Sequence, residues 1–179
     1  MLLGRSELIS RINENDLIIN LEDDFKIEGC LVDLRLGDVY KRSGEVSLYN
    51  YKRNTGNIDK VEPYTDDEGI IYRIQPFPKT YLVTTIEEVN VPDDLAIYIS
   101  RRSTIFRSGL MLDATYTNPG YHGKLTFLLI NFNETSVLIE KGFRIVQLGF
   151  FEVNGESEKY NGNWQGGVIS SNGEFHPPR

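Results

Sequence analysis

The feature that most constrains the fold is a series of short apolar runs that begins at Ile70. The runs are IIYRI, TYLVTTIEEV, LAIYISRR, KLTFLLINF, SVLIE and RIVQLGFFEV, and turn-forming Pro, Gly, Asn and Asp residues stand between them. Short runs with breaks at this spacing are typical of β-strands. No alternation of strands with helices and no internal repeat is visible. The sequence therefore predicts a mainly β protein of the barrel or jelly-roll type.

Two N-terminal segments show regular periodicity. Residues 4–16 are predicted to form a short helix, because Ser6 can cap it and the apolar residues that follow recur at helical spacing. The segment CLVDLRLGDVYK then alternates between apolar and other residues from Cys30 to Gly37. This two-residue period predicts a strand with one buried face.

A chain of 179 residues is most often one domain. We therefore predict a single domain over residues 1–179, with the polar residues 41–69 as an excursion and residues 155–179 as a flexible C-terminal arm. The arm is rich in Gly, Asn and Ser, yet it contains aromatic residues that a purely disordered tail usually lacks. Two interpretations stay open: an ordered tail or edge strand, or a lid that folds over a ligand with its glycines as hinges.

Composition argues against several classes of function. No apolar run is long enough to cross a bilayer and no secretory signal is present, so a cytoplasmic protein without a membrane partner is expected. The net charge of -7 argues against binding a nucleic acid polymer. Cys30 is the only cysteine and there are two histidines, so neither an intrachain disulfide nor a zinc site is expected. The P-C-x-x-C element of zinc-dependent deaminases is also absent.

This acidic chain concentrates three arginines and several hydroxyl residues in the stretch SRRSTIFRSG, residues 100–109. A guanidinium group offers a planar fork of donors that matches phosphate oxygens, and hydroxyls can satisfy the remaining acceptors. A small anionic ligand responds to local rather than net charge. The stretch is therefore either a solvated surface loop or a phosphate-binding loop.

Several motifs, in the same order along the chain, resemble those of dCTP deaminases. GCLVDLRLGD resembles their G-S-x-D-L-R-L-G strand, and RRSTIFRSGL resembles their R-S-S-x-x-R-x-G-L motif. DATYTNPGYHGKLTFLLIN, residues 113–131, resembles the T-A-x-x-I-D-P-G-[FW]-x-G strand pair, and KYNGNWQGG resembles the K-Y-x-x-Q-x-G arm. GFRIVQLGF, residues 142–150, resembles instead the G-[DE]-R-I-A-Q-L motif of the trimeric dUTPases, which share the fold. The resemblance covers about residues 1–170.

This resemblance implies a fold, an assembly and a ligand. The fold is a distorted, jelly-roll-like β-barrel of the dUTPase type, and the assembly is a homotrimer with pockets between subunits. The ligand is a deoxynucleoside triphosphate such as dCTP, dUTP or dTTP, with Mg²⁺ on its phosphates and no zinc.

The resemblance also implies where the nucleotide contacts the chain. Arginine and hydroxyl groups of the RRSTIFR loop grip the phosphates, and Arg101 is interpreted as a surface charge. The base lies near Ala114 and the backbone after it, while Tyr116 or Tyr121 packs under the deoxyribose. The arm covers the ligand through Tyr160 or Trp164. The nucleotide-binding residues implied are Arg102, Ser103, Thr104, Arg107, Ala114, Asn118, Tyr160 and Gln165.

The family's catalytic carboxylates are missing at the matching positions. The deaminase glutamate, five residues after the second glycine of P-G-x-x-G, is Leu128 here, and the dUTPase aspartate is Asn118. Leucine cannot exchange a proton, and asparagine can hydrogen-bond but cannot act as a base. No catalytic residue is therefore assigned.

Three hypotheses remain. The first is an active dCTP deaminase or dUTP diphosphatase with relocated catalytic groups, for which Asp113 is the first candidate base. The second is a nucleotide-binding protein with impaired catalysis, and the third is a protein whose pocket is vestigial. The second is favoured, because the arginines and the arm are retained while the carboxylates are lost.

Overall fold

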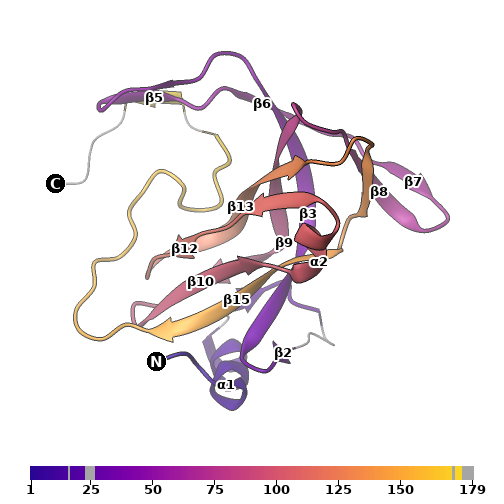
Figure 1. The fold of residues 1–179 in the computed structure, drawn as a ribbon. Coiled ribbons are helices and arrows are strands. Elements are labelled where there is room, and N and C mark those ends of the chain that lie inside the picture. Colours follow the sequence, from indigo (N-terminus) through magenta and orange to yellow (C-terminus); the bar gives the residue numbers. More distant parts are fainter. Residues whose placement is uncertain (16, 23–26, 171, 175–179) are drawn as a thin grey trace.

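The structure, a computed structural model, describes residues 1–15, 17–22, 27–170 and 172–174. It is mainly β, as predicted, with one N-terminal helix and a main sheet that curls into a half-barrel (Figure 1). No helix in these ranges is long and apolar enough to cross a membrane. In chain order the elements are α1 (Arg5–Asn15), β1 (Ile18–Ile19), β2 (Ile27–Glu28), β3 (Leu31–Ser43), β4 (Ser47–Leu48), β5 (Lys52–Asn54), β6 (Asn57–Lys60), β7 (Tyr64–Asp66), β8 (Gly69–Ile74), β9 (Thr80–Asn90), β10 (Leu95–Arg101), α2 (Ser103–Arg107), β11 (Leu110–Asp113), β12 (Tyr116–Thr117), β13 (His122–Asn131), β14 (Val137–Glu140), β15 (Arg144–Glu152) and β16 (Asn172–Glu174).

The main sheet is antiparallel and follows the order β11-β13-β9-β3-β15-β10-β12, with β1 on β9 and β2 and β6 on β3. Two three-stranded sheets flank it, in the orders β14-β8-β7 and β16-β5-β4. The second small sheet joins the polar excursion to the end of the chain, because β16 pairs with β5. The segment after β15 therefore runs along the outside of the molecule from one end of the sheet to the other (Figure 1).

The helix predicted over residues 4–16 is present as α1. It begins at Arg5, and the carbonyl of Gly4 accepts the Leu8 N–H at 3.0 Å. Ser6 therefore lies inside the first turn and does not cap the helix as predicted. The apolar stripe is buried against the core through Leu8 and Ile12.

Strand β3 shows how the sheet is bent. The predicted alternation holds from Val32 to Leu36, but Cys30 lies before the strand and is only half-buried. The pairing of β3 with β9 then shifts between Leu36 and Val39. Gly37 lies at this shift, where a Cβ atom would approach the Thr85 carbonyl oxygen to 2.7 Å. Only glycine allows so close an approach, and such a bulge bends the sheet.

The end of β13 is fixed by one buried amide. Asn131 is fully buried, and its Nδ2 donates to the carbonyls of Ile74 and Thr135 at 3.0 and 2.9 Å. Its Oδ1 accepts from the backbone N–H and Nδ2 of Asn133 at 2.9 and 2.8 Å. All four hydrogen-bonding positions of the amide are therefore used, and they tie β13 to β8 and to the following turn.

We expect Asn131→Asp to lower the free energy of unfolding by about 3 kcal/mol or more, because a buried carboxylate oxygen would then face two carbonyl oxygens. Urea denaturation at neutral pH measures this loss. Asn161→Asp, at an exposed position of the arm, is the matched control and should change stability by less than about 0.5 kcal/mol. Equal losses in the two variants would contradict the role given to Asn131.

Candidate functional site

A cavity of about 390 Å³ lies between β13, β12 and the C-terminal arm. Strand β11 pairs with the second half of β13, up to the rung Asp113–Leu128. The chain then leaves β13 and joins β10 through β12, where Thr117 lies opposite Ile97. The cavity opens where these two segments separate.

The walls of the cavity are aromatic and aliphatic. None of the described residues that line it is charged, and its polar side chains are three threonines, three tyrosines, Asn118 and Trp164. Such a surface suits an uncharged, flat ligand group with a few hydrogen-bonding atoms. Sequence reasoning missed Thr115, Thr126 and Ile169 as wall residues. Thr126 is marked in the sequence as a polar residue inside the apolar run KLTFLLINF, whereas nothing local marks Ile169.

Both tyrosines expected under a deoxyribose line the cavity, in different states. Tyr121 is buried, and its hydroxyl donates to the Lys124 carbonyl at 2.7 Å. Burial, reinforced by the neighbouring Tyr160, raises the pKa of Tyr121 to about 12. Tyr116 is 70% exposed and packs against Tyr98 with ring centroids 5.4 Å apart. Tyr121 is therefore a fixed, neutral wall, and Tyr116 is the one free to contact a ligand.

The C-terminal arm closes the outer side of the cavity on its own subunit. The Tyr160 N–H donates to the Pro119 carbonyl at 2.7 Å, and the Gly166 N–H donates to the His122 carbonyl at 2.9 Å. Both Tyr160 and Trp164 line the cavity, as expected of a lid. The guanidinium of Arg53 lies 5.8 Å from the Trp164 ring and links the arm to the excursion.

Gln165 has a different place from the one expected. Its Nε2 donates to the Gly120 carbonyl at 2.8 Å, and its Oε1 accepts the His122 N–H at 3.2 Å. It does not line the cavity, since its amide is used to hold the arm on the turn before β13. Whether the arm orders only with a ligand stays a prediction, and residues 171 and 175–179 of the arm lie outside the described residues.

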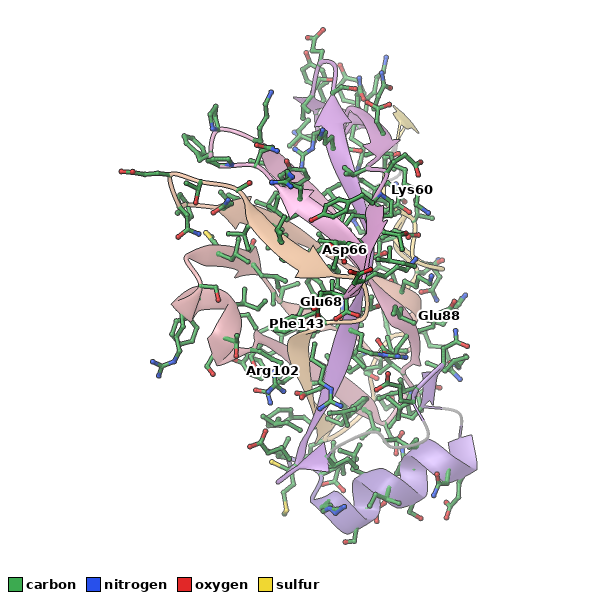
Figure 2. All side chains as sticks on the ribbon, turned by 90° about the vertical axis from the view of Figure 1, so that its right-hand side faces the viewer. Lys60, Asp66, Glu68, Glu88, Arg102 and Phe143 are labelled. Carbon is green, nitrogen blue, oxygen red and sulfur yellow. The ribbon has the colours of Figure 1, made fainter. Side chains whose placement is uncertain are left out.

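The arginine-rich stretch forms the end of β10 and the short helix α2. The Arg102 guanidinium pairs with the carboxylate of Asp33 on β3. Arg102 itself is labelled in Figure 2, beside β3. Arg101 and Arg107 are exposed, and each places its guanidinium 5.6 Å from the ring of Phe106. Arg101 is thus a surface charge, as interpreted from the sequence.

Of the eight residues implied by the resemblance, Gln165 holds the arm on the turn, and the other seven fall into two groups. Asn118 and Tyr160 line the cavity, and Ala114 is partly buried against the core beside it. None of the arginine and hydroxyl residues of the stretch lines the cavity of the single chain: Ser103, Thr104 and Arg107 are exposed on α2, and Arg102 is paired with Asp33. The structure therefore brings together the residues expected at the base and sugar and leaves those expected at the phosphates apart from them.

Leu128, at the position that matches the deaminase glutamate, is placed by the pairing of β13 with both of its neighbouring strands. Leu128 is half-buried and lies opposite Leu82 on β9 and opposite Asp113 on β11. Asn118, at the dUTPase aspartate position, is exposed at the cavity. No acidic side chain among the described residues replaces either one in the cavity wall.

Comparison with known proteins supports the resemblance. A family model described as dCTP deaminase-like matches residues 2–153. A probable deoxyuridine 5'-triphosphate nucleotidohydrolase of Methanothermobacter thermautotrophicus is 34% identical over 83% of this chain and 95% of its own. A dUMP-forming dCTP deaminase of Sulfurihydrogenibium sp. is 33% identical over 93% of this chain and 92% of its own.

A solved structure confirms the fold. The 2'-deoxycytidine 5'-triphosphate deaminase of Agrobacterium tumefaciens superposes with a TM-score of 0.61 at 16% identity over 83% of this chain. This chain spans about half of that protein, 46% of its length. The fold, the order of the motifs and the family model agree, and the chain belongs to the dCTP deaminase-like family.

Proposed function

We propose that this protein binds a pyrimidine deoxynucleoside triphosphate, namely dCTP, dUTP or dTTP, and that its catalysis is impaired relative to its family. The observation that carries the proposal is the uncharged, aromatic cavity of about 390 Å³ covered by the arm. An alternative is an active dCTP deaminase or dUTP diphosphatase, as two relatives are named. The family's two catalytic carboxylates are absent at Leu128 and Asn118, and their absence favours impaired catalysis over full activity.

The cavity accounts for only part of such a ligand. A base and a deoxyribose are uncharged and suit its walls, whereas a triphosphate requires cations, which the described wall lacks. Arg102 and Arg107, beside the hydroxyls of Ser103 and Thr104, offer those cations elsewhere on the subunit. We propose that a homotrimer brings the arginines of one subunit to the cavity of the next.

Mg²⁺ is proposed to arrive on the phosphates of the nucleotide and to neutralise part of their charge. The described residues contain no group of three or more His, Cys, Asp or Glu side chains that could hold a metal ion by themselves. Asp33 fits a role in holding Arg102 rather than the ion, because its carboxylate pairs with the Arg102 guanidinium and its second oxygen, Oδ1, is buried away from solvent.

Isothermal titration calorimetry of the native protein with dCTP, dUTP, dTTP and the ribonucleotides tests binding. Arg107→Ala should weaken the affinity roughly tenfold or more, because a charge-assisted hydrogen bond is worth about 1.5–3 kcal/mol. Arg101→Ala is the matched control, because it removes the same charge and the same stacking on Phe106. If the native protein binds none of these nucleotides, only the hypothesis of a vestigial pocket remains. If Arg107→Ala and Arg101→Ala weaken the affinity equally, Arg107 is not a specific phosphate ligand.

Limited proteolysis tests the lid. Saturating nucleotide should slow cleavage within residues 155–170, because Tyr160 and Trp164 would then contact the ligand as well as the turn. The β7–β8 hairpin, which projects from the opposite side of the molecule (Figure 1), is the internal control and should be cleaved at an unchanged rate. Equal cleavage of the arm with and without nucleotide would show that it is not a ligand-responsive lid.

Steady-state assays of ammonia release from dCTP and pyrophosphate release from dUTP test the impairment. General acid–base help contributes about 10²–10⁴-fold in rate, so both reactions should be slow even with bound nucleotide. Turnover on the order of 1 s⁻¹ or faster lies in the usual range of enzymes and would disprove the impairment.

A further inference from the structure

The last rung of the β11–β13 ladder joins Asp113 to Leu128. Directly opposite residues of an antiparallel pair point to the same face, with Cβ atoms about 4.5–5.5 Å apart. We infer that Asp113 supplies, from the neighbouring strand, the carboxylate that position 128 lacks, and that it is the general base in a residual deamination of a cytosine deoxynucleotide. This inference rests on the proposed function and adds the residue that would carry its chemistry.

The Asp113–Leu128 pair lies next to the cavity. Thr115, two residues after Asp113, lines the cavity, and so does Thr126, two residues before Leu128. Leu82, directly opposite Leu128 on β9, lines it as well. A step of two residues along a strand is about 7 Å. Asp113 does not itself line the cavity. Its strand partner Leu128 is one such step from Thr126, so the proposed water lies between the Asp113 carboxylate and the cavity wall.

Asp113 is also the exposed acid on the strands next to this position. Strands β9, β11 and β13 carry three acids, Glu87, Glu88 and Asp113. Glu87 is buried and accepts hydrogen bonds from Arg35, and Glu88 lies opposite Lys124. Asp113 is exposed, and no hydrogen bond or ion pair to another described residue holds its carboxylate.

The place of the carboxylate favours chemistry at the base over chemistry at the phosphates. The cavity is uncharged and suits a base, whereas a carboxylate beside a triphosphate would repel it. In Figure 2, Arg102 lies on the opposite side of β3 from Glu88, so this half-buried acid of β9 is also kept away from the proposed phosphate ligands.

The proposed step needs only water as a co-reactant. Asp113 takes a proton from water as the oxygen bonds to C4 of cytosine, and passes this proton to ring nitrogen N3. It then takes the second proton from the new C4 hydroxyl and gives it to the amino nitrogen as the C4–N bond breaks. One amine and one water become one carbonyl and one ammonia, and the carboxylate is regenerated.

The test measures ammonia release from dCTP by native protein, Asp113→Asn, Asp113→Glu and the control Glu88→Gln, with dCTP affinity determined by calorimetry for each. We expect Asp113→Asn to lower kcat at least about 100-fold with an affinity change of less than about threefold, and Glu88→Gln to resemble native protein. Asp113→Glu should recover part of the rate. The rate of the native protein should fall at acidic pH, and this fall should be absent from the residual rate of Asp113→Asn. A purely structural role of Asp113 would not abolish this pH dependence.

The outcomes separate this inference from the proposed function. Native deamination that survives Asp113→Asn, or native protein that binds dCTP and releases no ammonia, overturns the role of Asp113 and leaves nucleotide binding intact. If the protein releases pyrophosphate from dUTP in a way that depends on Asp113 but does not deaminate dCTP, the inference that Asp113 acts at the base is overturned. Native protein that binds no deoxynucleotide overturns the proposed function itself. Thermal melting of the exposed Asp113→Asn variant checks that the fold is retained.

Discussion

The two-residue period of β13 is the constraint on which the site depends. Leu125, Phe127 and Leu129 point into the core and are nearly fully buried. Burying each such side chain contributes about 1.5–3 kcal/mol, and a slip of one residue would move all three to the other face. The core therefore fixes the register of β13, and with it the orientation of Thr126 and Leu128 away from the core. The side chain at position 128 is placed by packing, whatever its chemistry.

A second constraint is the close contact of glycine backbones between the arm and the turn before β13. A Cβ atom on Gly123 would lie 2.5 Å from the Gly167 nitrogen, and one on Gly120 would lie 2.9 Å from the Lys159 Cβ. Gly123, Gly120 and Gly167 also have positive φ angles, of 122°, 79° and 76°. The arm can lie flat on the turn only because these positions lack side chains. That close contact brings Tyr160 and Trp164 over the cavity.

Much of this could be predicted from the sequence, because the signals are local. The period of two marks β3, the short apolar runs mark the later strands, and the helical spacing marks α1. The clustered arginines mark the segment after β10, which is predicted to be a loop but forms the short helix α2. The cavity could not be predicted in the same way. It depends on the separation of residues 114–117 from β13, and the register that pairs Asp113 with Leu128 is a long-range property. The use of Gln165 as a backbone clamp likewise depends on where the arm meets the turn.

Under the proposed function, binding and chemistry are separable, because different elements supply them. The cavity walls come mainly from β12, β13 and the arm, the cations proposed to bind phosphate come from α2 and the end of β10, and the position that matches the deaminase glutamate is a single residue on β13. Interactions that hold a ligand equally in its ground and transition states give affinity without rate. Replacement of that side chain by Leu128 removes a proton acceptor but leaves the walls, the arm and the arginines unchanged. In the proposed function, the fold keeps a nucleotide site without the usual catalytic group, and Asp113, opposite Leu128, is the residue proposed to supply the chemistry instead.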